Sequence, residues 1–130
     1  MESNFKILHR QVFRAETVII QEGSPGTRAY IIESGKVVIW RNVGGERRTL
    51  GVVGKGGIFG EMALIDNQPR MASVSALTDT TCVVISEDIF KKKIAEADPF
   101  VVGLLRIFVR NIRSLTEHYE ADNQAPGDDE

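Results

Sequence analysis

One short stretch of the sequence, residues 56–74, combines groups that suit an anion. Gly60 has no Cβ, so backbone N–H groups beside it can approach a ligand closely. The helix-forming run Glu61–Ile65 would aim its unpaired N–H groups and the positive end of its dipole at an anion. Arg70 adds a planar, permanently charged fork that matches a phosphate. These residue types at this spacing predict an anion-binding loop.

Glu61 brings a negative charge to the same loop, although a carboxylate repels phosphate. Its oxygens can accept a hydrogen bond from a sugar hydroxyl such as a ribose 2′-OH, and its charge can help to hold Arg70. The alternatives are that Glu61 is a solvated acid stabilised by the helix dipole, and that Arg70 is an ordinary surface arginine. The two residues together, with Phe59 ahead and Ala72–Val74 behind, favour a site for a phosphate joined to a hydroxylated sugar.

The pattern of residues around this loop resembles that of a known family. Phe59–Leu64, followed at a fixed distance by Pro69–Arg70 and Ala72–Val74, is similar to the phosphate-binding cassette of cyclic nucleotide-binding domains. Such domains occur in catabolite activator proteins, the regulatory subunits of cAMP-dependent kinase and cyclic-nucleotide-gated channels. The spacing from Glu61 to Arg70 matches the kinase and channel branches of the family. We call residues 56–74 the cassette below.

The resemblance implies a 3′,5′-cyclic nucleotide as the ligand. Arg70 would pair with the exocyclic phosphate oxygens, backbone N–H groups would complete the cradle, and Glu61 would accept a hydrogen bond from the ribose 2′-OH. Family members that prefer cGMP often carry threonine directly after the arginine, where this chain has Met71, so cAMP is predicted and cGMP is the alternative. The implied ligand-binding residues are Gly60, Glu61, Met62, Ala63, Arg70, Met71 and Ala72.

In this family the final helix usually covers the base as a lid. Arg113 and Thr116 lie at about the right distance along the chain and are the candidate lid residues. The alternative is that both belong to the solvated face of a helix. Ligand binding would draw the cassette and the C-terminal helices toward the β region, with the break at Asp98-Pro99 as a hinge.

The elements that must position the cassette are mainly strands. From Glu16 to about Ile85, short β-branched runs alternate with turns every eight to twelve residues or so, which favours an antiparallel β jelly-roll barrel. One hairpin is predicted between residues 30–32 and 37–40, with Gly35 in its turn, and another turn is predicted at residues 42–45. The fold class is therefore mainly β with flanking helices.

Helices are predicted on either side of this β region. Residues 1 to about 15 have apolar spacing that fits a short helix, and a short helix is predicted within the cassette. Ser86 is a plausible N-cap for a first C-terminal helix. Asp98 as N-cap and Pro99 at the first helical position start a second one, which runs to about Tyr119.

The last predicted helix carries a narrow apolar seam with heptad-like spacing. The favoured interpretation is that the helix packs on the β region, and the alternative is a homodimer or a protein partner bound through this helix. A domain of this fold that serves only for docking or dimerisation, without binding nucleotide, is the alternative function. The seam residues are Val101, Leu105, Phe108, Ile112, Leu115 and Tyr119.

Whole-chain properties bound the remaining possibilities. The 130 residues predict one domain over residues 1–120, followed by a disordered acidic tail at 121–130. A formal net charge of −2 argues against a broad basic face for nucleic acid. No apolar run approaches the ~20 residues of a membrane span, and no signal peptide is recognisable. Cys82 is the only cysteine, which suits the cytoplasm, and the alternative is a periplasmic protein whose signal was removed.

The sequence offers little to catalysis. His9 and His118 lie near the two chain ends, the strand region has no histidine for a metal site, and Thr49 stands where a P-loop needs glycine. After Tyr119 only eleven residues remain, too few for a DNA-binding helix-turn-helix. We therefore predict a sensor or regulatory domain, not an enzyme, with no metal, no cofactor and no output domain in this chain. It is either a stand-alone protein or a module of a longer one.

Overall fold

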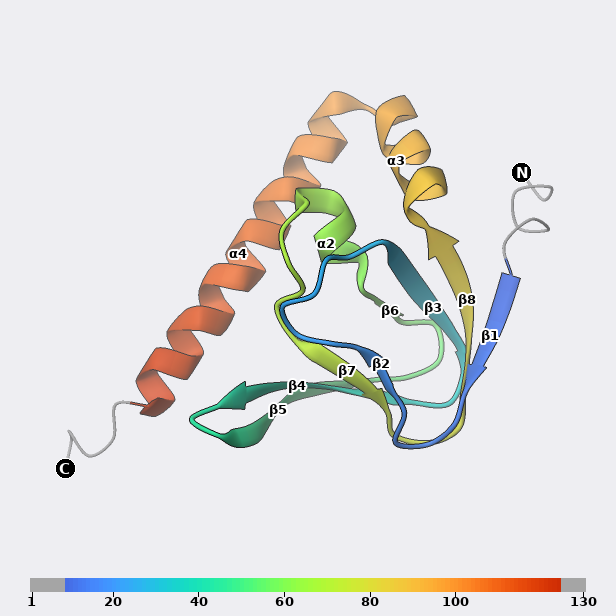
Figure 1. Ribbon diagram of the computed structural model, residues 1–130. Coiled ribbons are helices and arrows are strands. Elements are labelled where there is room, and N and C mark those ends of the chain that lie inside the picture. The colour runs from blue at the N-terminus through green and yellow to red at the C-terminus, as the bar shows by residue number, and fades with distance from the viewer. Residues whose placement is uncertain (1–8, 125–130) are drawn as a thin grey trace. The chain divides into compact units, whose positions relative to one another are not determined.

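The computed structural model describes residues 9–124 of the chain, and within them it contains two four-stranded antiparallel sheets and three helices (Figure 1). This confirms the mainly β class with flanking helices. The first sheet has the order β1 (His9–Phe13), β8 (Thr80–Ser86), β3 (Arg28–Ser34) and β6 (Ile58–Phe59). The second has the order β2 (Val18–Ile20), β7 (Ser73–Ala76), β4 (Val37–Val43) and β5 (Glu46–Val53). The helices are α2 (Glu61–Asp66), α3 (Glu87–Glu96) and α4 (Pro99–Gln124).

The chain divides into two compact units. The first ends at Glu96 and contains both sheets with α2 and α3, and the second begins at Ala97 and contains α4. Within the first unit, α2 contacts β3 and α3, and α3 contacts β8. That residues 1–120 form one domain stays a prediction. Within residues 9–124, no helix combines the length and the apolar character that crossing a bilayer requires.

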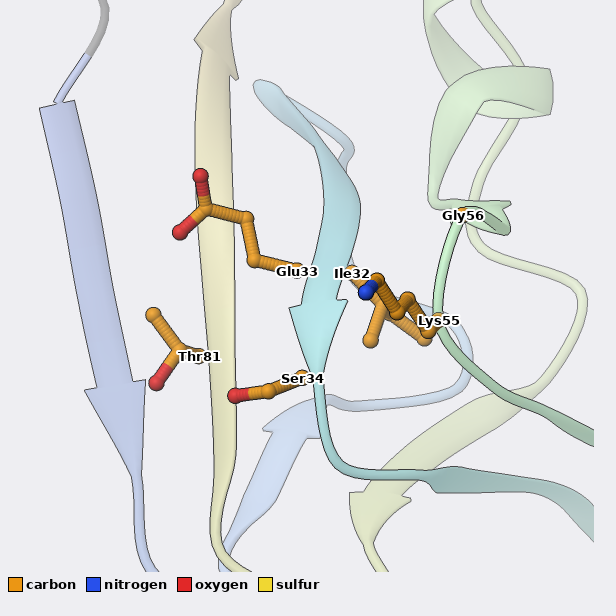
Figure 2. Close-up of a pocket in the computed structure, with 6 residues that line it drawn as sticks. All are labelled: Ile32, Glu33, Ser34, Lys55, Gly56 and Thr81. Carbon is orange, nitrogen blue, oxygen red and sulfur yellow. The ribbon is translucent and has the colours of Figure 1, made fainter.

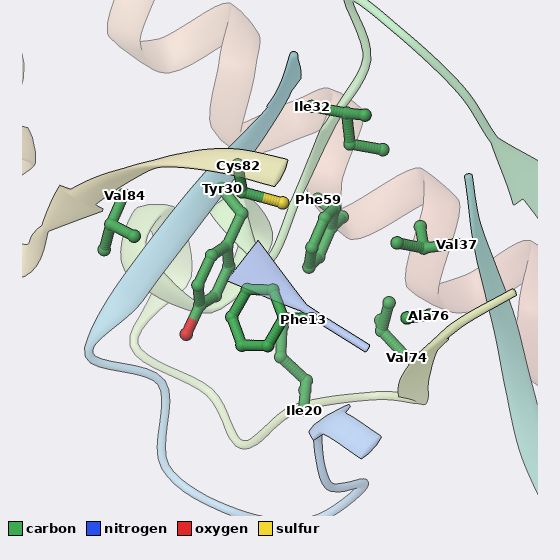
Figure 3. Close-up of a cluster of buried hydrophobic side chains, with 10 residues drawn as sticks. All are labelled: Phe13, Ile20, Tyr30, Ile32, Val37, Phe59, Val74, Ala76, Cys82 and Val84. Atoms are coloured by element: carbon green, nitrogen blue, oxygen red, sulfur yellow. The ribbon is translucent and has the colours of Figure 1, made fainter. Parts of the chain in front are cut away.

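The apolar core of the first unit draws side chains from both sheets (Figure 3). Inside this core the Tyr30 ring stacks on Phe59 with centroids 5.0 Å apart and meets Phe13 edge-on at 5.9 Å. Because Phe59 ends β6 directly before Gly60, its burial anchors the first residue of the cassette helix. The ten buried members are Phe13, Ile20, Tyr30, Ile32, Val37, Phe59, Val74, Ala76, Cys82 and Val84.

The predicted N-terminal helix is wrong where the structure describes it. His9–Phe13 form the strand β1, which pairs with β8 from His9 opposite Val84 to Phe13 opposite Thr80. Val12 is exposed and Phe13 is buried, which is the period of two that a strand requires. The free edge of β8 gives these residues a hydrogen-bonding partner, and pairing overrides local spacing. The rest of the predicted helix, residues 1–8, lies outside the described residues.

The predicted hairpin around Gly35 is also wrong, because β3 belongs to the first sheet and β4 to the second. Gly35 has φ of 94°, and the chain crosses there from one sheet to the other. The Lys36 N–H donates to the Thr78 hydroxyl at 3.1 Å, and the Leu77 N–H donates to the Lys36 carbonyl at 2.8 Å. The crossing is therefore tied to the β7–β8 connection, which spans the same two sheets.

Other predicted boundaries are confirmed. The turn after β4 is a two-residue hairpin loop, Gly44-Gly45, with φ of 61° and 87° as such tight turns require. The Ser86 hydroxyl accepts from the Ile89 N–H at 3.3 Å, and the Asp98 carboxylate accepts from the Phe100 N–H at 2.7 Å, as expected of N-caps. The helix α4 begins at Pro99 as predicted.

The end of α4 differs from the prediction. The helix continues past residue 119 to Gln124, so the first four residues of the predicted tail are helical, and residues 125–130 lie outside the described residues. Four seam residues of α4 are exposed: Val101, Phe108, Ile112 and Leu115.

Candidate functional site

The cassette contains β6, and its helix α2 follows directly from the buried end of that strand. Gly60 occupies the N-cap position of α2 with φ of 85°, in the left-handed region that only glycine adopts readily. The helix spans Glu61–Asp66 and ends at Asn67, whose φ is 57° and whose N–H donates to the Ala63 carbonyl at 2.9 Å. Gln68 then donates its N–H to the Asp66 carboxylate at 3.0 Å. The predicted short helix and the turn after it are confirmed.

The side chain of Arg70 lies beside the N-cap of this helix and is buried, with 9% of the residue's surface exposed. Its Nη1 donates to the Gly60 carbonyl at 2.7 Å, and its Nη2 donates to the Arg28 carbonyl at 2.8 Å. A guanidinium has five N–H donors, so these two bonds leave three for a ligand. The burial excludes the alternative that Arg70 is an ordinary surface arginine.

The backbone of Arg70 is held by the β2–β3 loop, residues 21–27. The Arg70 N–H donates to the Ser24 carbonyl at 2.9 Å, and the Gly23 N–H donates to the Arg70 carbonyl at 2.8 Å. One residue earlier in the loop, the Glu22 N–H donates to the buried Ser73 hydroxyl at 2.9 Å. The loop is therefore hydrogen-bonded both to the backbone of Arg70 and to the first residue of β7.

Two glycines surround the guanidinium closely. A Cβ built on Gly60 would lie 2.9 Å from Nη1 of Arg70, and a Cβ on Gly26 would lie 3.0 Å from both Nε and Cζ. The Cβ on Gly26 would also lie 2.5 Å from the Ala63 Cβ. Gly60 is among the site residues predicted from the sequence, whereas Gly26 is not. The sequence does show that the β2–β3 loop contains a second glycine besides Gly23. Only Gly23 has the positive φ that a turn requires, so Gly26 needs another reason.

Burial sets the electrostatics of the site. Loss of water around Glu61 raises the pKa of its carboxyl above the ordinary value of 4.5, although a backbone N–H and the nearby Arg70 charge oppose the change. Burial likewise lowers the pKa of Arg70, against the opposing influence of Tyr30 and Glu61. Glu61 is half-buried, so it is not the fully solvated acid of the alternative interpretation. The site therefore contains two opposite charges, Glu61 and Arg70, and both are partly desolvated.

The structure brings the predicted cassette residues together from two segments. Gly60, Met62 and Ala63 lie at the start of α2, and Met71 and Ala72 continue from Arg70 toward β7. The bond from Arg70 to the Gly60 carbonyl joins the segments.

The candidate lid residues lie on α4 in the second unit. There Thr116 donates its hydroxyl to the Ile112 carbonyl at 2.9 Å. The lid assignment of Arg113 and Thr116 stays a prediction.

A shallow pocket elsewhere on the first unit does not match the predicted ligand chemistry (Figure 2). None of the predicted ligand-binding residues lines it. Its carboxylate, from Glu33, is already paired with Arg10 at 2.7 Å. Its lining residues are Ile32, Glu33, Ser34, Lys55, Gly56 and Thr81.

Two further features of residues 9–124 concern metal binding and the single cysteine. No group of three or more histidine, cysteine, aspartate or glutamate side chains gathers there as a metal site would require. Burial, with a smaller contribution from Glu33, raises the pKa of the Cys82 thiol to about 11, so this buried thiol stays protonated at neutral pH.

The chain thus forms a β domain of two antiparallel sheets, in which a buried arginine donates to the N-cap carbonyl of a short helix. The chain belongs to the cyclic nucleotide-binding domain family, because residues 10–97 match the model of that family. The matched range includes the cassette and α3 and ends before α4.

Curated relatives of known name agree with this membership. The chain is 35% identical over 96 residues to the CRP-like cAMP-activated global transcriptional regulator of Mycobacterium tuberculosis, covering 73% of this chain and 43% of that protein. It is 36% identical over 99 residues to the cAMP-dependent protein kinase regulatory subunit of Hypocrea atroviridis, covering 76% of this chain and 20% of that protein. The chain thus spans less than half the length of either relative.

Solved structures of related proteins have a similar fold. The cAMP-bound form of the EAL enzyme Bd1971 superposes with a TM-score of 0.81 at 36% identity, covering 88% of this chain and 30% of that one. The cGMP-bound form of the same enzyme gives 0.78 at 37% identity, covering 85% of this chain and 30% of that one. The catabolite activator protein of Thermus thermophilus gives 0.72 at 27% identity, covering 94% of this chain and 58% of that one.

Proposed function

We propose that this chain binds a 3′,5′-cyclic nucleotide, with cAMP preferred to cGMP, and acts as a non-catalytic sensor or regulatory domain. The observation that carries the proposal is the buried guanidinium of Arg70, held at the N-cap of α2 with three N–H donors left for an anion. Relatives whose names include cAMP, and structures of a relative bound to cAMP and to cGMP, support it. We also propose that the two sheets together form the jelly-roll barrel that is typical of this family.

The cassette supplies the contacts that this ligand needs. Arg70 pairs with the exocyclic oxygens of the cyclic phosphate. Backbone N–H groups at residues 60–63 and at Met71 and Ala72 complete the anion cradle. Glu61, which is half-buried on the first turn of α2, accepts a hydrogen bond from the ribose 2′-OH.

Met71 favours adenine in this proposal because its side chain has no hydroxyl to bond guanine. We expect cAMP to bind the purified chain more tightly than cGMP in calorimetric titrations. Met71→Thr introduces a hydroxyl directly after Arg70, so it should raise cGMP affinity and leave cAMP affinity nearly unchanged. Tighter binding of cGMP than of cAMP by the unmodified chain would contradict the preference for adenine.

Binding of neither nucleotide would overturn the proposed function. The alternative, a docking or dimerisation module of the same fold, would then be favoured. Its specific support is the exposure of the large apolar residues Val101, Phe108, Ile112 and Leu115 on α4. Sedimentation of the same sample, with and without nucleotide, reports whether that face joins two copies of the chain.

The proposal also gives α4 the role of a lid whose closed state is favoured by the ligand. Amide hydrogen exchange over residues 99–118 should therefore slow when cAMP is added, most of all near Arg113 and Thr116. The amides of the β4–β5 hairpin serve as the internal reference, because both strands belong to the first unit and lie outside the cassette and the C-terminal helices. Identical protection of residues 99–118 with and without cAMP would count against the lid.

A further inference from the structure

We propose that Gly26 is a positioning residue of the cyclic-nucleotide site. The missing side chain at residue 26 lets the β2–β3 loop lie directly against Arg70 and against Ala63 of α2. The loop thereby fixes the charge that receives the phosphate relative to the helix whose N–H groups face it. The consequence for ligand binding rests on the proposed function, whereas the packing itself does not.

Residue 26 has no free space for a Cβ. A Cβ there would lie 2.5 Å from the Ala63 Cβ and 3.0 Å from Nε and Cζ of Arg70. Carbon atoms in van der Waals contact are about 3.5–4.0 Å apart, so an added methyl group must displace something. The Ala63 methyl group is buried and has no rotamer that would carry it away. The displacement must therefore fall on α2, on the guanidinium or on the loop.

The β2–β3 loop cannot easily move away from Arg70, because several bonds hold it there. Gly23 and Ser24 exchange backbone hydrogen bonds with Arg70, and the Glu22 N–H bonds the Ser73 hydroxyl. The Glu22 carboxylate is also paired with Arg41 at 3.3 Å. Moving the loop would break the bonds that hold the backbone of Arg70. The strain of an added Cβ therefore reaches α2 and the guanidinium.

Residue 26 requires glycine for a steric and not for a conformational reason. The described glycines with φ in the left-handed region do not include Gly26: they are Gly23, Gly35, Gly44, Gly45, Gly56 and Gly60. Alanine can adopt the backbone of Gly26, so Gly26→Ala tests contact alone. Gly51 is the matched control, because its φ is also outside the left-handed region and a Cβ there would meet nothing within 4 Å.

The packing is tested without ligand by a double-mutant cycle of Gly26→Ala and Ala63→Gly in denaturant unfolding. Removing the Ala63 methyl group makes room for the new one. We therefore expect the double variant to be markedly more stable than the sum of the two single effects predicts. Gly51→Ala combined with Ala63→Gly should be additive. Additive effects for Gly26→Ala and Ala63→Gly as well would overturn the inference.

The consequence for the site is tested by cAMP titration. Gly26→Ala should lower affinity by about tenfold or more, because it displaces a charged contact, while Gly51→Ala stays within about twofold. In an Arg70→Ala background, Gly26→Ala should cause a much smaller loss, which a general weakening of the fold would not produce.

The unfolding cycle and the cAMP titration together distinguish a failure of the inference about Gly26 from a failure of the proposed function. If the unmodified chain binds cAMP and Gly26→Ala binds as tightly as Gly51→Ala, the inference is overturned and the proposed function stands. If the unmodified chain binds neither cAMP nor cGMP, the proposed function is overturned. In that case the unfolding cycle still decides whether residue 26 packs against Ala63.

Discussion

Replacing Arg70 with alanine should lower the affinity for cAMP by a factor of tens to thousands while the domain stays folded. Truncating one partner of a buried, hydrogen-bonded charge pair costs about 2–5 kcal/mol, and about 1.4 kcal/mol corresponds to tenfold in affinity. Arg70 meets the conditions for the upper part of that range because it is buried and already oriented by two carbonyl acceptors. The phosphate then receives a fixed fork rather than a mobile one.

The fold should survive Arg70→Ala although two carbonyls lose their donors. A hydrogen bond to a charged group contributes about 1.5–3 kcal/mol, against a total stability of about 5–15 kcal/mol for a domain. Removing the guanidinium also removes the cost of burying its charge, which is visible as the lowered pKa of Arg70. Arg70→Lys keeps the charge and loses the planar fork, so its affinity should lie between those of the unmodified chain and Arg70→Ala.

Arg28→Ala is the matched control for this experiment. Arg28 gives Arg70 only its backbone carbonyl, and its residue surface is exposed, so the variant loses the same formal charge and keeps the acceptor. Calorimetric titration and a melting curve on the three variants separate binding from folding. Equal affinities for Arg70→Ala and Arg28→Ala, with both variants folded, would contradict the assignment of Arg70 to the phosphate.

The sequence predicts most of the fold where a local rule decides it, and fails where pairing across the molecule decides it. Gly44-Gly45 specifies a tight hairpin by itself, because both residues must adopt positive φ. Gly35 looks the same in the sequence, but its left-handed φ serves a crossing between sheets. The strand His9–Phe13 exists because β8 offers it an edge, which no short-range pattern records.

The same distinction holds at the site. Glu61 and Arg70 can be found from residue types and spacing, because their chemistry is unusual within one short loop. Ser73 and Ser75 alternate with apolar residues in the sequence, which alone predicts polar positions of a strand. Both are buried, and their hydroxyls accept from the Glu22 N–H and from the Trp40 indole N–H at 2.9 Å. Such acceptors stabilise neighbouring elements, and their partners are distant in the sequence.

The second large effect should appear when the contact between Glu61 and the ribose is removed from either side. We expect the unmodified chain to bind cAMP about tenfold to a hundredfold more tightly than 2′-deoxy-cAMP, which is the usual contribution of about 1.5–3 kcal/mol for a hydrogen bond to a charged group. Glu61→Ala should bind the two nucleotides equally, because the acceptor that distinguishes them is gone. Asp66→Asn is the control, since that carboxylate lies at the other end of α2.

The pH dependence of this discrimination follows from the burial of Glu61. Burial raises the pKa of its carboxyl above 4.5, so protonation begins at a higher pH than for a solvated glutamate. A protonated carboxyl is the weaker acceptor, so the preference for cAMP over 2′-deoxy-cAMP should fall as pH drops through the raised pKa. In the absence of ligand, the contribution of Glu61 to the stability of the fold increases as the pH drops. The proton is bound more tightly in the folded state, and this contribution to the free energy of unfolding is full below about pH 4.5 and lost as pH rises through the raised value.

Titrations of cAMP and 2′-deoxy-cAMP over a pH series therefore test the position of Glu61 and its charge together. Glu61→Gln keeps the shape of the side chain without an ionisable proton, so its discrimination should be small and independent of pH. A preference for the 2′-hydroxyl that stays equally large in Glu61→Ala would assign the ribose contact to another residue. The buried arginine would remain the phosphate partner in that case, because Arg70→Ala measures a different part of the same ligand.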